Sequence, residues 1–160
     1  MRSRNSSILL KADFAKAFDS VNWKFLFSMM IRMGFGHKWV KWIETYLKSS
    51  TISILVNRSP TEEFKLERGI RHEDPLSPFL FIIAGEGLNL LMNMATGKGL
   101  VCRAAIGKDK IPLSHLQYAD DTIFIGSWLK RNIRNVLKVL LCFEEVSGLK
   151  INLKKVSYMV

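Results

Sequence analysis

Three aspartates, each placed in or beside a short apolar segment, are the residues whose types and spacing suggest chemistry. Asp120 and Asp121 follow Tyr118 and Ala119 between two apolar segments, and Asp13 lies near the end of another, over residues 8–14. Aspartates at a hairpin tip are common turn formers, so a purely structural interpretation of Asp120 and Asp121 stays open. An aspartate in a buried strand, however, is costly without a counter-charge. If these strands are neighbours in one sheet, the three carboxylates converge.

Converging carboxylates repel one another unless cations neutralise them, and hard oxygen ligands select Mg²⁺ or Mn²⁺. Two such ions, roughly 3.5–4 Å apart, support in-line attack at phosphorus. The chain carries 24 Lys and Arg against 14 Asp and Glu, a formal net charge of +10. This excess favours a polyanionic partner, with nucleic acid ahead of an anionic membrane surface. The combination indicates phosphoryl or nucleotidyl transfer on a nucleic acid.

The elements that must position these residues follow from hydrophobic periodicity and turn residues. The pattern predicts strands over residues 8–14, 113–125 and 150–160, a hairpin over 51–66, and helices over 21–33, 39–47, 74–94 and 129–146. Mixed strands and helices predict an α+β fold, with a small antiparallel sheet that carries the carboxylates and packs against helices.

Length and composition predict one globular domain of a protein inside the cell. The chain has 160 residues, 48% of them hydrophobic, and only two cysteines, which are too few for a disulfide framework. No signal peptide opens the chain, and the longest apolar run, residues 78–85, is shorter than the roughly 20 residues that span a bilayer. We therefore expect an intracellular protein, nuclear or cytoplasmic, that does not contact a membrane.

Four segments also resemble, in order, the palm motifs of reverse transcriptases from LINE-type (non-LTR) retrotransposons. They are residues 10–23 (LKADFAKAFDSVNW), 68–71 with 74–78 (RGIR and DPLSP), 116–121 (LQYADD) and 147–152 with Lys155 (SGLKIN and K). The resemblance implies the palm of an RNA-directed DNA polymerase, with an RNA template, a DNA primer and dNTP as its partners.

The resemblance also implies a role for individual residues. Asp13, Asp120 and Asp121 would hold two Mg²⁺ or Mn²⁺ ions, which activate the primer 3′-hydroxyl and stabilise the leaving pyrophosphate. Phe18 would lie under the deoxyribose and exclude a 2′-hydroxyl. Lys155 would protonate the pyrophosphate as it leaves.

Several of these residues also have plain structural interpretations. Phe18 is equally an ordinary core residue, and Lys155 taken alone is a surface lysine. Arg68 and Arg71 either bind template or nucleotide phosphate or form a solvated basic face. Tyr118 either packs beside the primer end or fills the sheet.

The second motif departs from the family at two positions. The family has Gln-Gly where this chain has His72 and Glu73. Glu73 would place a side chain and a negative charge where triphosphate and template should lie. We interpret His72 as a damaged nucleotide contact and not as a new catalytic base, so we expect impaired nucleotide binding. His37 and His115 are interpreted as structural.

The resemblance covers the palm alone. Residues 1–160 are thus expected to form a single partial reverse-transcriptase domain, with the fingers, thumb and endonuclease regions of the parent polyprotein missing. Surfaces that would face those parts, including the helix with Trp39 and Trp42, are expected to be exposed. The alternative is a non-catalytic nucleic-acid-binding relic. Another two-metal enzyme, such as a nucleotide cyclase, would not need residues 68–78 and 147–152, and we rank it lower.

Overall fold

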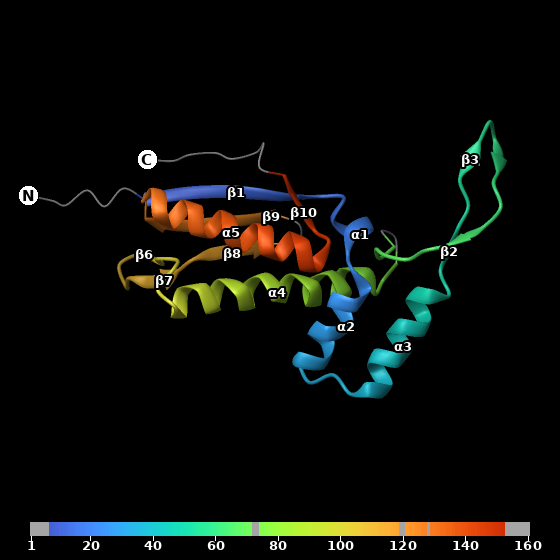
Figure 1. The fold of residues 1–160 in the computed structure, drawn as a ribbon, viewed down its shortest axis with the longest axis horizontal. Coiled ribbons are helices and arrows are strands. Elements are labelled where there is room, and N and C mark those ends of the chain that lie inside the picture. The colour runs from blue at the N-terminus through green and yellow to red at the C-terminus, as the bar shows by residue number, and fades with distance from the viewer. Residues whose placement is uncertain (1–6, 72–73, 119–120, 128, 153–160) are drawn as a thin grey trace, which may run out of the picture.

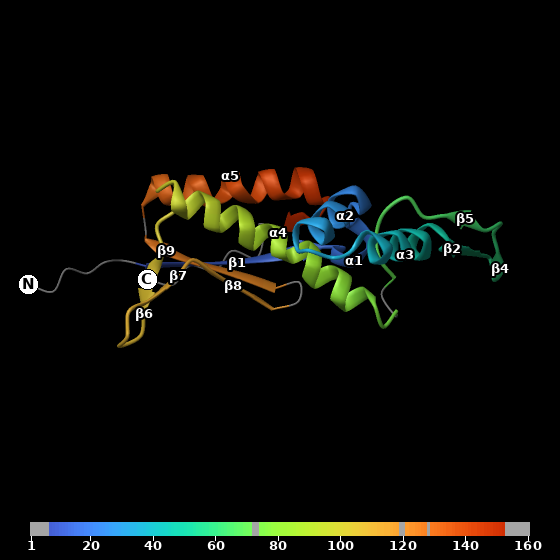
Figure 2. The ribbon, with the colours of Figure 1, turned by 90° about the horizontal axis from the view of Figure 1, so that it is seen from below.

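A computed structural model of the chain describes residues 7–71, 74–118, 121–127 and 129–152. Its centre is a four-stranded antiparallel sheet with the strand order β10-β1-β9-β8 (Figure 1). These strands are β1 (Ser7–Ala15), β8 (His115–Tyr118), β9 (Asp121–Ser127) and β10 (Lys150–Asn152). The long helices α4 (Ser77–Gly97) and α5 (Lys130–Ser147) lie together on one side of the sheet (Figure 2). The predicted α+β fold is confirmed.

The two faces of the sheet have different surroundings, because successive side chains of a strand point to opposite faces. On β1, Leu10, Ala12 and Phe14 are buried beneath the helices, whereas Lys11 and Asp13 alternate with them and are only half-buried. The same alternation runs along β9. In the part of the chain that the structure describes, no helix covers the second face (Figure 2). The alternation along β1 places Asp13 on this second face.

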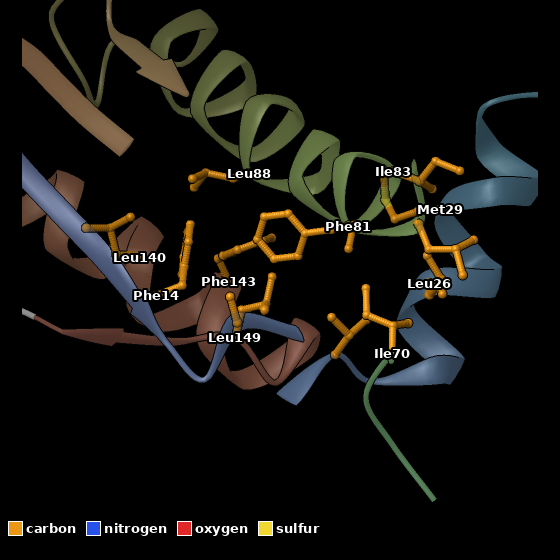
Figure 3. Packing of buried hydrophobic residues seen from close by; sticks show 14 of the residues in the cluster. Phe14, Leu26, Met29, Ile70, Phe81, Ile83, Leu88, Leu140, Phe143 and Leu149 are labelled. Atoms are coloured by element: carbon orange, nitrogen blue, oxygen red, sulfur yellow. The ribbon is translucent and has the colours of Figure 1, made fainter. Parts of the chain in front are cut away.

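Three phenylalanines from separate elements form the centre of the core. Phe14 of β1 contacts Phe81 of α4 and Phe143 of α5 edge-on, with ring centroids 6.5 and 6.0 Å away (Figure 3). Leu88 and Leu149 are fully buried beside them. Burial of such side chains contributes about 1.5–3 kcal/mol each, so this cluster fixes the helices against the sheet.

Helix α4 is long and apolar enough, by length and composition, to cross a membrane. Here one stripe of the helix, including Leu80 and Ala84, lies in the core, and α4 packs against α5 and against α2 (Trp23–Arg32). Its opposite side leaves Phe79 and Ile82 exposed. The high hydropathy of α4 therefore comes from two sides of the helix, one buried in the core and one exposed.

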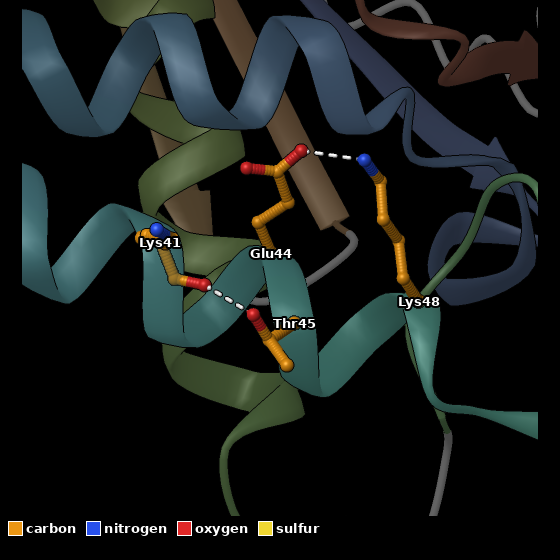
Figure 4. Close-up of polar contacts among 4 residues, drawn as sticks. All are labelled: Lys41, Glu44, Thr45 and Lys48. Carbon is orange, nitrogen blue, oxygen red and sulfur yellow. Dashed lines mark hydrogen bonds and ion pairs between the residues drawn. The ribbon is translucent and has the colours of Figure 1, made fainter.

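Between β1 and the projecting hairpin lie α1 (Ala17–Ser20), α2 and α3 (His37–Lys48). The Asn22 side chain caps α2 by accepting hydrogen bonds from two backbone amides of its first turn. On α3, Lys48 forms an ion pair of 2.6 Å with Glu44 (Figure 4). On the same helix, the Thr45 hydroxyl donates a hydrogen bond of 2.9 Å to the carbonyl oxygen of Lys41, one turn earlier (Figure 4).

The side of α3 that carries the tryptophans faces solvent, as expected. Trp39 and Trp42 are 55% and 52% exposed, and their rings meet edge-on with centroids 5.4 Å apart. Val40, Ile43 and Leu47 form the buried side of the helix.

The hairpins differ from the prediction in detail. Residues 51–66 form two short pairs, β2 (Thr51–Ile52) with β5 (Phe64–Lys65) and β3 (Leu55–Val56) with β4 (Ser59–Pro60). All four strands are exposed, and β3–β4 projects from the body of the protein (Figure 1). A further hairpin, β6 (Ala104–Ile106) with β7 (Ile111–Leu113), was not predicted. Its largely exposed strands lack the apolar alternation that identifies a half-buried strand.

Candidate active site

A row of four side chains crosses the open face of the sheet at one level. Asn152 of β10 pairs in register with Asp13 of β1, Asp13 pairs with Asp121 of β9, and Asp121 pairs with Tyr118 of β8. Direct partners in an antiparallel sheet point to the same face, with Cβ atoms about 4.5–5.5 Å apart. The structure therefore brings together three of the predicted site residues: Asp13, Asp121 and Tyr118.

The row is accessible from solvent. Asp13, Asp121 and Asn152 are half-buried, and Tyr118 at the edge strand is 86% exposed. Among the described residues, both carboxylates of the row are therefore partly open to solvent.

Lys11 supplies a positive charge to the row. Its Nζ lies 3.0 Å from Oδ1 and 3.0 Å from Oδ2 of Asp121. Lys11 reaches this carboxylate because it precedes Asp13 by two residues and so points to the same face of β1. Neither Lys11 nor Asn152 was among the predicted site residues. Lys11 could have been found from the sequence, because it lies two residues before Asp13 and therefore on the same face of the strand. Asn152 could not, because its pairing with Asp13 is known only from the sheet register.

The donor atoms of the row fit a hard divalent cation. Two carboxylates and the amide oxygen of Asn152 are oxygen ligands of the kind that Mg²⁺ and Mn²⁺ prefer. Among residues 7–71, 74–118, 121–127 and 129–152, no group of three or more His, Cys, Asp or Glu is placed to hold a metal. Asp120, the third predicted carboxylate, lies outside these residues, so the described donors are two of the three predicted carboxylates plus Asn152.

Phe18 lies just beyond the row, on α1. Its ring stacks on Phe81 with centroids 5.0 Å apart, and its carbonyl oxygen accepts a hydrogen bond of 2.7 Å from the amide of Ile70. The side chain is half-buried. These contacts fit both sequence interpretations of Phe18, because a ring held against the core still leaves part of its surface to solvent.

The two predicted phosphate-binding arginines lie in the segment that follows β5. Both Arg68 and Arg71 are exposed. Arg68 lines a cleft of about 1000 Å³ between α2, α3 and the segment after β5, and no member of the row lines this cleft. Its charged walls are Lys24, Glu44, Lys48, Lys65, Glu67 and Arg68. The cleft is therefore a concave surface separate from the row, and basic residues outnumber acidic ones along its walls.

The remaining predicted site residues, His72 and Lys155, lie outside the described residues, as does Glu73. Of the histidines interpreted as structural, His115 stacks on Phe124 with ring centroids 6.0 Å apart, and its Nδ1 lies 3.0 Å from the Ser114 hydroxyl. Burial lowers the pKa of His115 below its usual 6.5, an effect that the nearby carboxylate of Glu86 partly opposes.

The second and fourth sequence motifs meet at the turn that follows β1. The amide of Gly69 donates to the carbonyl oxygen of Val21 at 2.8 Å, and the amide of Asn22 donates to that of Ser147 at 2.8 Å. A Cβ on Gly69 would lie 2.7 Å from the carbonyl oxygen of Asp19, and one on Gly148 would collide with the carbonyl oxygen of Ser20. Both glycines thus permit a close approach that fixes the strand carrying Asp13.

Comparison with known proteins agrees with this arrangement. Residues 1–160 match the family described as "Reverse transcriptase (RNA-dependent DNA polymerase)". The chain is 30% identical over 156 residues to a Pol polyprotein from the type-1 retrotransposable element R2 of Popillia japonica, covering 95% of this chain and 20% of that protein. It is 32% identical over 126 residues to the 149 kDa protein of transposon TX1 from Xenopus laevis, covering 78% of this chain and 9% of that protein.

The fold is also similar to solved structures of telomerases. The chain superposes with a TM-score of 0.70 on apo telomerase from Candida tropicalis, at 15% identity, covering 96% of this chain and 30% of that one. Telomerase from Candida albicans, solved with a fragment of telomeric RNA, gives a TM-score of 0.71 at 11% identity, covering 97% and 28%. The chain spans about a fifth of the R2 relative and less than a third of the telomerases. With its whole length matched by one family model, the chain belongs to the reverse transcriptase family.

Proposed function

We propose that this chain acts as the palm of an RNA-directed DNA polymerase, which transfers nucleotides from dNTP to the 3′-hydroxyl of a DNA primer on an RNA template. The observation that carries the proposal is the direct pairing of Asp13 with Asp121 on the uncovered face of the sheet. A primer–template duplex would lie on that face. Fingers and thumb would be supplied by sequence outside residues 1–160.

The carboxylates of Asp13 and Asp121, together with Asp120, would hold the metal ions. Two Mg²⁺ or Mn²⁺ ions, when bound, supply the positive charge that activates the primer hydroxyl and stabilises the leaving pyrophosphate. Asn152, in register with Asp13, would complete the oxygen donors of the row.

Other residues of the chain would bind and orient the substrates. The half-buried ring of Phe18 would lie under the deoxyribose and exclude a 2′-hydroxyl, with its position fixed by Phe81 and Ile70. The exposed ring of Tyr118, at the end of the row, would pack beside the primer end. Arg68 and Arg71 would contact phosphate, and Lys155 would give a proton to the pyrophosphate.

A second candidate function is nucleic-acid binding without catalysis. The presence of His72 and Glu73 where the family has Gln-Gly favours it, because a carboxylate there would repel the triphosphate. Binding would then depend on the basic residues alone. It would weaken steeply with salt and would not respond to the removal of Asp13.

The experiment that tests the proposal uses a chimera, in which residues 1–160 replace the palm of a complete LINE-type polymerase. Primer extension on RNA is measured with and without His72→Gln plus Glu73→Gly. Extension by the unrepaired chimera supports a competent palm. Extension only after repair means that the nucleotide pocket is damaged and the carboxylate row is intact, as the second candidate function requires.

Two matched aspartate variants complete this experiment in the repaired chimera. Asp121→Asn removes a charge from the row and should reduce extension by about a thousandfold or more, given the several kcal/mol of charge stabilisation that bound metals provide. Asp109→Asn removes the same charge from the exposed turn between β6 and β7 and should leave extension unchanged. Equal rates for the two variants would exclude the row as the catalytic site.

A further inference from the structure

Asp121 of the row contacts a lysine of the neighbouring strand. Lys11 Nζ is equidistant from the two carboxylate oxygens, at 3.0 Å from each. Both side chains remain partly accessible, with exposed fractions of 39% for Lys11 and 48% for Asp121. The ammonium therefore lies in front of both carboxylate oxygens, on the side from which a cation would bind.

This position has an electrostatic reason. Asp13 and Asp121 are direct register partners on neighbouring strands, so two negative charges face each other across the sheet. Like charges directly opposite each other destabilise a strand pair. The Lys11 ammonium neutralises Asp121 and so reduces that repulsion. Lys11 lies on the same face of β1 as Asp13, opposite Ile123 of β9.

A divalent ion at Asp121 cannot share this arrangement with Lys11. Mg²⁺ binds carboxylate oxygens at about 2.0–2.1 Å, so a lysine ammonium held on the same two oxygens would remain within a few ångströms of the ion. The Coulomb repulsion between a double and a single positive charge at such a distance is twice that between two ammonium groups. The two cations therefore compete for the two oxygens that Lys11 contacts.

We propose that Lys11 is a resident counter-cation of the active site, which neutralises Asp121 in the metal-free protein and must leave it when a divalent ion binds. Lys11 is thus a positioning residue that sets metal affinity through Asp121. The inference rests on the proposed function, since it assigns the metal to the row. It adds that the metal-free row is held together by a charge from the chain itself.

Two consequences follow for the protein without substrate. Removal of the ammonium should strengthen divalent-ion binding, because the ion no longer displaces a bound cation. It should also weaken the metal-free sheet, because Asp121 loses its ammonium partner and then repels Asp13 more strongly. A merely structural lysine would produce the second effect alone.

The test measures Mn²⁺ binding to the complete chain by the loss of the free-ion electron paramagnetic resonance signal. In Lys11→Met, which keeps the aliphatic stem, the dissociation constant should fall roughly 2- to 5-fold, the range expected for loss of a partly exposed ion pair. Lys11→Arg retains the charge and should bind Mn²⁺ about as tightly as the original chain. Lys41→Met lowers the net charge equally on α3 and should change affinity little.

A second measurement uses the unsubstituted chain and so does not depend on the folding of a variant. Without metal, the ammonium protons of Lys11 should give a slowly exchanging signal in a ¹H–¹⁵N correlation spectrum, identified by its absence in Lys11→Arg. Saturation with Mg²⁺ should abolish that signal as Lys11 moves into solvent. A signal that persists unchanged would overturn the inference.

The outcomes separate this inference from the proposed function. Mn²⁺ binding that Asp121→Asn abolishes, with equal or weaker affinity in Lys11→Met, would overturn the role of Lys11 and leave the metal row standing. Mn²⁺ binding that is absent, or unaffected by Asp121→Asn, would overturn the metal site and the inference together. Both the inference and the proposed metal site are supported if Mn²⁺ binds more tightly to Lys11→Met, binds as before to Lys11→Arg and Lys41→Met, and no longer binds to Asp121→Asn.

Discussion

The indole Nε1 of Trp23 donates a buried hydrogen bond of 2.7 Å to the carbonyl oxygen of Gly69. Trp23 begins α2, and Gly69 lies in the segment that carries Arg68 and Arg71. The bond therefore ties the second sequence motif to α2, which follows β1 and α1 in the chain. Together with the bond from Ile70 to Phe18, it fixes the segment against the turn after β1.

Loss of this bond should destabilise the whole domain. Trp23→Phe removes the donor, leaves a buried carbonyl unsatisfied and opens a small cavity, which should lower the free energy of unfolding by about 2–4 kcal/mol. Urea denaturation followed by circular dichroism measures the change. Trp39→Phe, at an exposed tryptophan, is the control and should change stability by no more than about 0.5 kcal/mol. Equal effects of the two substitutions would contradict the importance of the buried bond.

Gly69 should resist substitution for a reason beyond its backbone conformation. Its φ is +84°, and an added Cβ would lie 2.7 Å from the carbonyl oxygen of Asp19. Gly99 has a comparable φ of +66° with no atom within 4 Å of an added Cβ. Gly99→Ala should cost about 1–2 kcal/mol from the left-handed conformation alone. Gly69→Ala should cost at least about 2 kcal/mol more, because the turn after β1 must shift.

Thermal or urea unfolding of the two alanine variants, compared side by side, isolates the steric contribution. Similar losses would show that the turn after β1 can yield to a methyl group, and the close packing of the two motifs would then have little energetic weight.

Replacement of Thr122, which lies next to Asp121, by valine should stabilise the folded protein. Its hydroxyl is buried and has no hydrogen-bond partner within the described part of the chain. An unsatisfied buried hydroxyl costs about 1–3 kcal/mol, and valine has the same shape without that cost, so Thr122→Val should raise the free energy of unfolding by about 1 kcal/mol.

The contrasting variant for Thr122 is Ser147→Ala. The Ser147 hydroxyl is buried but donates to the carbonyl oxygen of Phe143 at 2.6 Å and accepts from the amide of Leu149 at 3.1 Å. Its removal should destabilise by about 1–3 kcal/mol. A loss of stability in Thr122→Val would reveal a partner for the Thr122 hydroxyl.

The tip of the projecting hairpin should become more stable with a glycine. Asn57 and Arg58 join β3 to β4, and both have positive φ values, 51° and 66°, as a two-residue type I′ turn requires. Asparagine tolerates this conformation, whereas arginine does not. Arg58→Gly should therefore slow amide hydrogen exchange in β3 and β4 roughly two- to fivefold, corresponding to about 0.5–1 kcal/mol.

Hydrogen exchange is the suitable measurement for this hairpin because its strands are exposed and can open without the core. Asn57→Gly is the control and should have a smaller effect. No change in exchange for Arg58→Gly would mean that the turn conformation does not limit hairpin opening.

His115 should make the stability of the domain depend on pH. Burial lowers its pKa in the folded state, opposed by Glu86 and reinforced by the positive charge of Arg103. The unfolded state then binds more protons than the folded state as the pH falls below about 6.5, so stability is full above that pH and decreases below it. His115→Phe, which preserves stacking on Phe124, should remove this component of the pH dependence.

The measurement is urea unfolding at pH 5.5 and 7.5 for the original chain and for His115→Phe. His37→Gln, at an exposed histidine on α3, should retain the original pH dependence. An unchanged pH dependence in His115→Phe would assign the effect to other groups.

Local sequence patterns predicted the principal elements, because hydrophobic period and turn chemistry act over a few residues. The helices predicted over residues 21–33, 39–47 and 129–146 were of this kind. The β6–β7 hairpin escaped prediction because its strands bury little, and with burial absent there is no alternation to detect. Even the hairpin over residues 51–66 was predicted in outline only, since its pairing depends on the turn at Asn57 and Arg58.

The sequence by itself determined the types of residue available for chemistry: aspartates at the ends of strands, an aromatic residue five positions after Asp13, and a basic excess. Only the tertiary structure decided that Asn152, Asp13, Asp121 and Tyr118 form one row, because strand order and register bring together residues more than a hundred positions apart. The same register gave Lys11 its contact with Asp121. Pairing across a sheet is a non-local interaction, and no local pattern specifies it.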